Sequence, residues 1–269
     1  MKHESAMPRI DRRGLVKTAA VIPALGLLGA RVGSVKAQDD IVVTMVTDTA
    51  GLGDQNFNDL GYRGLLEAVE DFGVTENVIE SQDAASFIPN MTQSAEQSAL
   101  SIAVGFLLTD AVTQVASQFP DKAFLIIDSV SEGDNVLSVI FKEHEGAFLA
   151  GVVAGLTTTT NRLGVVGGQK IPPVVRYVVG FEAGVRSVNP EATVEVAYAD
   201  TFGDPALGKE FTLAQYNAGA DIVFPVAGAT GIGSFDAAKE MGPGFWVIAV
   251  DTDQQQLGAP YQLCVATKG

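Results

Sequence analysis

The sequence of 269 residues is poor in the side chains that form disulfides or bind transition metals. It contains one cysteine, Cys264, and two histidines, His3 and His144. A single cysteine excludes a disulfide within the chain, and structural zinc sites need several cysteine or histidine ligands. We therefore expect no cofactor and no metal site built from these residues.

Positive charge is also scarce. The chain has 17 Lys and Arg residues against 32 Asp and Glu residues. Residues 1–37 hold seven of the basic and two of the acidic ones, so the remainder carries 10 basic and 30 acidic residues, a net charge of −20. Such an excess of negative charge repels nucleic acid and anionic lipid. We expect a solvated acidic surface and no nucleic-acid partner.

The first 37 residues have the pattern of an export signal. The motif DRRGLVK precedes the apolar run at 18–30, and Val35-Lys36-Ala37 has the small-residue pattern of a cleavage site. The run is shorter than the roughly 20 residues that span a bilayer. We predict a twin-arginine-like signal at 1–37 and an exported, extracytoplasmic protein. No cysteine stands directly after the run, so lipid attachment has no acceptor there.

Short apolar runs recur along the remaining chain, with helix-like segments between them. Runs without polar alternation are typical of strands buried on both faces, and the intervening segments carry apolar residues every three to four positions. This alternation predicts an α/β protein with doubly wound parallel sheets. The expected strands are 41–46, 102–108, 123–128, 162–167, 192–198, 221–227 and 245–251. The expected helices are 58–73, 110–120, 174–188, 204–219 and 233–241.

A longer helical pattern rich in small residues covers 141–160 and indicates a crossover between two lobes. We expect residues 38–152 to form the first α/β lobe and residues 153–255 the second. The last segment, 256–269, has a strand-like run that would leave the second lobe.

Ligands of open α/β sheets bind beyond the carboxyl ends of the strands, so residues that follow strands are candidate site residues. The first such segment, TDTAGLGDQNFND, spans 47–59. It has no lysine, which excludes a phosphate-binding P-loop. A calcium loop is excluded because Ala50 and Leu52 stand where oxygen ligands should follow Asp48.

The remaining polar residues of this segment suit a planar ligand with hydroxyl or N–H donors. Asp48 and Asp54 can accept hydrogen bonds, and Asn58 offers an amide. Phe57 is either an exposed ring for stacking or a packing residue at the start of the next helix, and the sequence favours neither.

Four later strand ends each allow a structural and a functional interpretation. Asp110 is a helix cap or a ligand contact. Tyr177 is a packing residue or a stacking platform. Gly228 belongs to a G-x-x-G-x-G motif, which differs from the dinucleotide-binding motif G-x-G-x-x-G. It marks either a tight turn or a backbone contact to a ligand oxygen. Asp251 ends a strand, where it makes a turn or accepts ligand hydroxyls.

No set of residues for catalysis is apparent. Asp251 and Asp253, two positions apart on an extended chain, point to opposite sides and are poorly placed as an acid–base pair. His144 lies among charged residues of a helix, and the chain has no G-x-S-x-G motif. We therefore expect a protein that is not an enzyme.

Several long segments of the chain resemble the basic membrane protein (Bmp) family. The members of this family are substrate-binding proteins of ABC transporters and act as purine nucleoside receptors. The matching stretches are GDQNFNDLGYRGLLEA, FKEHEGAFLAGVVAG, VVGGQKIPPVVRYVVGFEAGVR, FGDPALGKEFTLAQYNAGADIVFPVAGATGIGSFDAAKE and VIAVDTDQ. The resemblance implies a two-lobe, type I periplasmic-binding-protein architecture. It also implies that a nucleoside is held between the lobes and delivered to a membrane permease.

The resemblance further implies roles for individual residues. Phe57 and Tyr177 would stack on the two faces of the base, although the family usually has Phe at the second position. The other implied contacts are Asp48, Asp54 and Asn58 in the first binding loop, Asp110 for the base or ribose, Gly228 through its backbone, Asp251 for ribose hydroxyls, and Lys268.

Two alternatives remain open beside this interpretation. A sugar or polyol receptor of the same fold would use the same aromatic residues, and an exported oxidoreductase would also suit the twin-arginine motif. In the family, further elements follow the lysine strand and complete the first lobe. We therefore expect residues 256–269 to supply only part of that completion, as in a truncated product.

Overall fold

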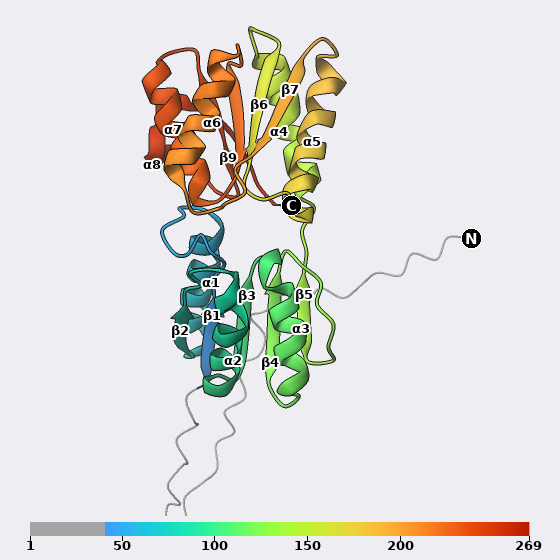
Figure 1. Cartoon of the computed structure of the whole chain (residues 1–269), viewed down its shortest axis with the longest axis vertical. Coiled ribbons are helices and arrows are strands. Elements are labelled where there is room, and N and C mark those ends of the chain that lie inside the picture. Colours follow the sequence, from blue (N-terminus) through green and yellow to red (C-terminus); the bar gives the residue numbers. More distant parts are fainter. Residues whose placement is uncertain (1–40, 269) are drawn as a thin grey trace, which may run out of the picture. The chain divides into compact units, whose positions relative to one another are not determined.

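The computed structural model describes residues 41–268, which belong to one compact unit. The export signal predicted at 1–37 lies outside the described residues. The described chain forms two five-stranded sheets with flanking helices, and every strand pairing is parallel (Figure 1). The predicted two-lobe α/β architecture is confirmed.

The first lobe has the strand order β2-β1-β3-β4-β5. Its strands are β1 (Val42–Val46), β2 (Thr75–Ile79), β3 (Leu100–Val104), β4 (Ala123–Ile127) and β5 (Val136–Val139). Its helices are α1 (Phe57–Phe72), α2 (Phe87–Gln97) and α3 (Thr109–Gln118), with short 3-10 turns η1 (Ala84–Ser86) and η2 (Phe106–Leu108).

The two faces of this first sheet are covered unequally. Phe124 and Ile126 of β4 are buried in a core with α2 and α3. Leu125 alternates to the opposite face, where it is half-buried, and its neighbour Leu137 on β5 is 61% exposed. Parallel sheets are normally covered by helices on both faces. The strands β4 and β5 therefore present an open apolar surface beside α1.

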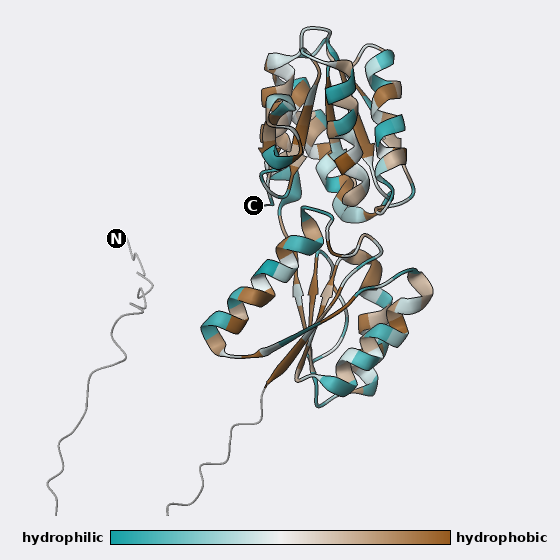
Figure 2. Cartoon of the chain, turned by 90° about the vertical axis from the view of Figure 1, so that its left-hand side faces the viewer, coloured by the Kyte–Doolittle hydropathy of each residue, from teal (hydrophilic) through white to brown (hydrophobic). Residues whose placement is uncertain are grey.

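The second lobe has the strand order β10-β9-β8-β6-β7. Its strands are β6 (Arg162–Gly167), β7 (Thr193–Tyr198), β8 (Ile222–Val226), β9 (Trp246–Val250) and β10 (Gln262–Ala266). Its helices are α4 (Glu143–Thr157), α5 (Pro172–Val188), α6 (Pro205–Asn217), α7 (Ala229–Met241) and the short α8 (Gln255–Gly258), followed by the 3-10 turn η3 (Ala259–Tyr261). Strands carry mainly hydrophobic residues, whereas the helices alternate between polar and apolar faces (Figure 2).

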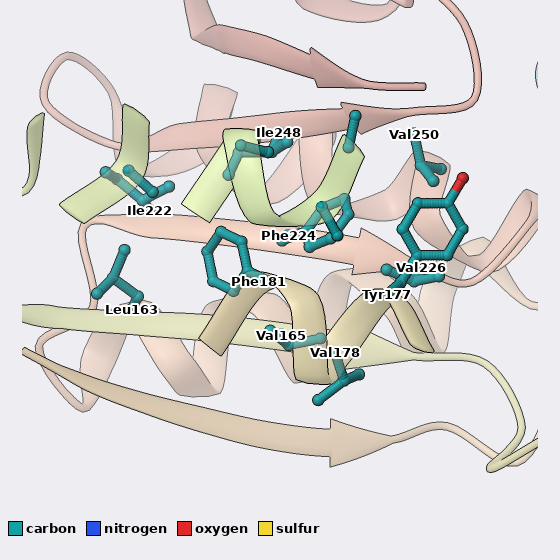
Figure 3. Close-up of a cluster of buried hydrophobic side chains, with 14 of the residues drawn as sticks. Leu163, Val165, Tyr177, Val178, Phe181, Ile222, Phe224, Val226, Ile248 and Val250 are labelled. Atoms are coloured by element: carbon teal, nitrogen blue, oxygen red, sulfur yellow. The ribbon is translucent and has the colours of Figure 1, made fainter. Parts of the chain in front are cut away.

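Helices α4 and α5 cover one face of the second sheet. Their apolar side chains join those of β6, β8 and β9 in the core cluster of Figure 3, with Tyr177, Val226 and Val250 at one end of it. The two helices approach closely because glycines line their contact. A Cβ atom at Gly151 would lie 2.2 Å from the carbonyl oxygen of Phe181. Helices α6 and α7 cover the other face.

The lobe boundaries differ from the expected ones. The limit expected between 152 and 153 falls inside α4, because Ala147, Ala150 and Ala154 all pack in the core of the second lobe. The second lobe therefore starts with α4. Strand β10 pairs with β9, and Ala266 is buried in the same core. The segment 256–269 was expected to help complete the first lobe, but its described strand is part of the second sheet.

Candidate functional site

A pocket lies at the carboxyl ends of strands from both sheets. Eight of the nine residues predicted for the site line it, and Asp110 does not. The predicted residues among its lining are Asp48, Asp54, Phe57, Asn58, Tyr177, Gly228, Asp251 and Lys268. Further lining residues that the sequence did not single out include Gly105, Phe106, Leu107, Asp128, Val174 and Phe202.

Asp54 anchors the start of α1. Its buried carboxylate accepts hydrogen bonds from the backbone N–H groups of Asn56 (3.0 Å), Asn58 (2.8 Å) and Asp59 (3.1 Å). Carboxylates satisfy the free N–H groups of a helix N-terminus in this way. Burial raises the pKa of Asp54, and these hydrogen bonds oppose the rise. Asp54 thus shapes the loop, since its oxygens are already occupied by protein donors.

Asn58 connects Asp54 to Asp48. Its Nδ2 atom donates to Asp48 Oδ1 (2.9 Å) and to Asp54 Oδ2 (3.1 Å). With both donors used, Asn58 Oδ1 is buried and has no partner among the described residues. Burial raises the pKa of Asp48 to about 6, against the lowering effect of hydrogen bonds from Ala50 and Asn58. The loop therefore brings to the pocket wall two residues with unusual polar groups: Asn58, whose amide oxygen lacks a donor, and Asp48, whose pKa lies well above the usual range.

Phe57 is the first residue of α1 and lies at the pocket wall. The Nζ atom of Lys268 lies 4.0 Å from the centroid of its ring, which is a cation–π contact. Gly105, which follows β3 with φ +110°, allows the ring to pack closely. A Cβ atom there would lie 3.2 Å from Phe57 Cε1 and 3.4 Å from Asp48 Oδ2. The ring thus contacts Lys268 through one face and the Gly105 turn at its edge.

Lys268 also links the two lobes. Its ammonium group makes an ion pair with Asp128, directly after β4, and lies 3.9 Å from Asp251 Oδ1, directly after β9. Burial raises the pKa of Asp128, and the charge of Lys268 opposes this. Asp128 was not predicted, although its place after the run AFLII matches the strand-end rule that singled out Asp251.

Tyr177 is part of the core as well as of the pocket wall. Its side chain is 3% exposed, and its ring meets Phe224 edge-on with centroids 5.9 Å apart. Its hydroxyl donates a 2.6 Å hydrogen bond to Asp251 Oδ1. Burial and the neighbouring charge of Asp251 raise the pKa of Tyr177, so the phenol keeps its proton. Tyr177 therefore fixes the orientation of Asp251.

Phe202, like Tyr177, is an aromatic residue that lines the pocket from the second lobe. It is buried in the segment between β7 and α6, and a Cβ atom at Gly168 would lie 2.3 Å from its ring. Gly228, with φ +56°, is the N-cap of α7. It lies next to Phe202, since a Cβ atom at Gly228 would lie 3.2 Å from the carbonyl oxygen of Phe202. Phe202 was not predicted as a site residue, although it stands in the segment FGDP, which follows a strand and precedes a helix.

Asp110 requires a correction. It is exposed in the first turn of α3 and is absent from the pocket lining. The chain makes the 3-10 turn η2 after β3, so the residues at the strand end are Gly105, Phe106 and Leu107. Asp110 is not the helix cap either, since the N-cap position is Leu108.

Residues 41–268 lack the features of two other kinds of site. Within that range, no group of three or more His, Cys, Asp or Glu side chains is arranged to hold a metal ion. None of the helices in the same range is long and apolar enough to cross a membrane.

Comparison with known proteins gives consistent matches. Residues 41–267 match the Bmp family model, described as ABC transporter substrate-binding protein PnrA-like. The CD4+ T-cell-stimulating antigen of Listeria innocua is 37% identical over 242 residues, which cover 84% of this chain and 67% of that protein. The ABC transporter nucleoside-binding protein BmpA of Lactococcus lactis is 34% identical over 235 residues, covering 83% and 67%. The chain thus spans about two thirds of the length of these relatives.

Solved structures agree with the fold. An ABC transporter solute-binding protein from Aeropyrum pernix K1 superposes with a TM-score of 0.78 at 29% identity, covering 82% of this chain and 65% of that one. The arabinose-binding protein AraP from Geobacillus stearothermophilus gives a TM-score of 0.60 at 16% identity, covering 80% of this chain and 76% of AraP. At that identity the likeness concerns the fold alone.

Proposed function

Since the chain belongs to the Bmp family of PnrA-like ABC transporter substrate-binding proteins, a class of transport receptors and not of enzymes, we propose that it captures a purine nucleoside between its lobes and delivers it to a membrane permease. The name of the Lactococcus lactis relative, a nucleoside-binding protein, supports the ligand class.

The observation that carries this proposal is the pairing of an aromatic ring with free acceptors at one wall of the pocket. Phe57 offers a flat apolar surface, and the unpartnered Oδ1 atom of Asn58 belongs to the next residue. A purine has a flat face and N–H donors at its edge, so both features are used by one ligand. Stacking of a base on an aromatic ring contributes roughly 1–3 kcal/mol.

Phe202 is a better second stacking residue than Tyr177. Both line the pocket from the second lobe, but the hydroxyl of Tyr177 is bound to Asp251 and its ring packs against Phe224. Phe57 and Phe202 come from different lobes, so closure of the lobes over a ligand brings two rings to one base. Such closure is the usual motion of periplasmic binding proteins.

The charge of the pocket favours a nucleoside over a nucleotide. Within residues 41–268, the charged side chains that line it are those of Asp48, Asp54, Asp128, Asp251 and Lys268. The single ammonium group is already paired with a carboxylate. A phosphate group would meet uncompensated negative charge, whereas ribose hydroxyls can donate to carboxylates.

The proposed route follows from the family. Delivery to a permease requires an extracytoplasmic protein that associates with the membrane through that permease, and the twin-arginine-like segment at 1–37 would direct its export.

Calorimetric titration of the full chain with adenosine, guanosine and inosine tests the proposal. We expect one-to-one binding of at least one of them, a matching thermal shift, and much weaker binding of its 5′-monophosphate. Ribose, arabinose and glucose test the sugar-receptor alternative. Binding of a sugar without binding of any nucleoside would contradict the proposal.

A further inference from the structure

Helix α4 is apolar on its inner and on its outer side. Its small residues face inward, where Ala147, Ala150 and Ala154 pack in the core of the second lobe. Larger apolar residues lie on the outer side, where Leu149 and Leu156 are 66% and 70% exposed. A helix that is apolar all round is normally buried. We therefore expect another surface to cover the outer side of α4.

Exposed apolar residues of α5 extend this surface. The two helices run side by side in the same direction, since a Cβ atom at Gly180 would contact the backbone of His144 and one at Gly184 that of Phe148. Phe148, Leu149 and Val179 line a groove between them. We call the exposed apolar residues of both helices the α4 face, which consists of Phe148, Leu149, Val153, Leu156, Val179 and Val188.

The α4 face is large enough for an interface between two copies of the chain. From the exposed fractions of its six residues, it offers roughly 500 Å² of apolar surface, which is as much as the largest patch of an ordinary monomer. Two copies that pair through this face would bury roughly 1,000 Å² in total, which meets the lower limit of a specific interface. The polar residues around it would add to this area.

Charge favours a second copy as the partner. Residues 38–269 carry a net charge of −20, so two copies repel each other over most of their surface. The segment 146–157 has no charged residue, and the α4 face is neutral throughout. A basic partner would be attracted to the acidic surfaces instead, and anionic lipid would be repelled by the whole protein. Two copies can meet at the α4 face without burying like charges.

The ends of α4 favour antiparallel pairing. Glu145 lies in the first turn of the helix, where it is exposed and paired with Lys142. Parallel pairing about a twofold axis would bring two Glu145 side chains together, whereas antiparallel pairing separates them and places opposite helix ends side by side. If the axis passes near Val153, Leu149 of each copy meets Leu156 of the other.

We propose that the α4 face is a homodimer interface, in which α4 packs antiparallel to α4 of a second copy about a twofold axis. None of the six residues of the α4 face lines the pocket, so the interface and the ligand site use different residues. The inference is therefore independent of the proposed function.

Sedimentation velocity of the full chain tests the interface. We expect a dimer at about 100 µM, a concentration at which even weak association is visible. Leu149→Glu should weaken the dimer at least about 100-fold, because two carboxylates would be buried without partners. Leu137→Glu is the matched control, since Leu137 is 61% exposed but lies on β5 of the first lobe. This control should remain a dimer. Thermal unfolding checks each variant, and Leu149→Ser replaces Leu149→Glu if that variant is not folded.

A mixture of two variants tests the antiparallel arrangement. Leu156→Lys alone should be as monomeric as Leu149→Glu. Mixing the two variants should restore a dimer, because the introduced carboxylate of one chain then meets the introduced ammonium group of the other, while the two remaining leucines meet each other. Parallel pairing would give no such rescue, since each introduced charge would then face a leucine.

A monomeric unmodified chain would overturn the inference, and so would a dimer that persists in Leu149→Glu or is lost in Leu137→Glu. A mixture that stays monomeric would refute the antiparallel pairing. Calorimetry with inosine on the same samples keeps the two proposals apart. Leu149→Glu should bind inosine as the unmodified chain does, so a failure of nucleoside binding in both would contradict the proposed function and leave the interface standing.

Discussion

Lys268, which follows the last strand of the second lobe, forms an ion pair with Asp128 at the end of β4 in the first lobe. Both side chains are largely buried, at 13% and 5% exposure. A buried ion pair stabilises little by itself, but loss of one partner leaves the other charge uncompensated. The bridge therefore couples the stability of the protein to the arrangement of its pocket.

Lys268→Met should lower the free energy of unfolding by about 3 kcal/mol at pH 8, because Asp128 would be left as a buried, unpaired carboxylate. Burial already raises the pKa of Asp128, and removal of Lys268 takes away the charge that opposes this rise. The variant should thus lose less stability at pH 5, where Asp128 can take up a proton. Urea unfolding at both pH values measures this, and Lys268→Met/Asp128→Asn should recover part of the loss. Equal stability of the single and double variants would argue against the bridge.

Phe57→Ala should weaken nucleoside binding by about 1–3 kcal/mol through loss of the stacking surface. The ring is half-buried at the start of α1, so the fold should persist. Phe72→Ala is the matched control, since Phe72 ends the same helix and is 79% exposed. Calorimetry with inosine compares the two variants. Normal binding by Phe57→Ala would make Phe57 a packing residue only.

Asp48 should make stability fall as the pH rises from about 4 to about 6. Burial raises the pKa of Asp48 from 3.8 to about 6. Between these values the unfolded chain has lost the proton that the folded chain keeps, so the unfolded state is favoured increasingly with pH. The total effect is about 3 kcal/mol, and it stays constant above pH 6. Asp48→Asn should remove this contribution.

The difference between the unmodified chain and Asp48→Asn in urea unfolding at pH 4, 5, 6 and 7 isolates this effect from that of other acids. The stability of the variant relative to the unmodified chain should increase over this range. A difference that does not change with pH would show that Asp48 titrates normally.

Arg176→Met should destabilise the protein because it leaves Glu143 unpaired. The guanidinium group makes two 2.8 Å hydrogen bonds to the fully buried Glu143 carboxylate. Burial alone would raise the pKa of Glu143, but the hydrogen bonds and charge of Arg176 outweigh this and lower it. Arg176 is 35% exposed, so we expect a moderate loss of about 1–3 kcal/mol. The double variant Arg176→Met/Glu143→Met should be more stable than Arg176→Met, and additive losses would contradict the pairing.

The sequence predicted the fold where strands are apolar on both faces. Strands β1, β6 and β8 are of this kind, and the family resemblance, now confirmed, assembled them into two lobes. Strand β2, with the sequence TENVI, was not predicted because it is a partly exposed edge strand with polar residues. Strand β5 is only four residues long and was missed for a similar reason.

The sequence predicted those residues of the candidate site that come directly after a strand. Asp48 and Asp251 were found in this way, and both line the pocket. Asp110 was placed too close to a strand end because the turn η2 after β3 has no clear signal in GFLLTD. Asp128 and Phe202 were missed because a lone Asp or Phe in a loop resembles an ordinary turn or packing residue.

The most direct test of the central claim is a calorimetric titration of the full chain with inosine in the presence of a hundredfold excess of ribose. The account predicts one-to-one binding of inosine that ribose does not suppress, because ribose alone lacks the base that would stack on Phe57 and Phe202. Absence of binding by inosine, adenosine and guanosine, or complete suppression by ribose, would contradict it.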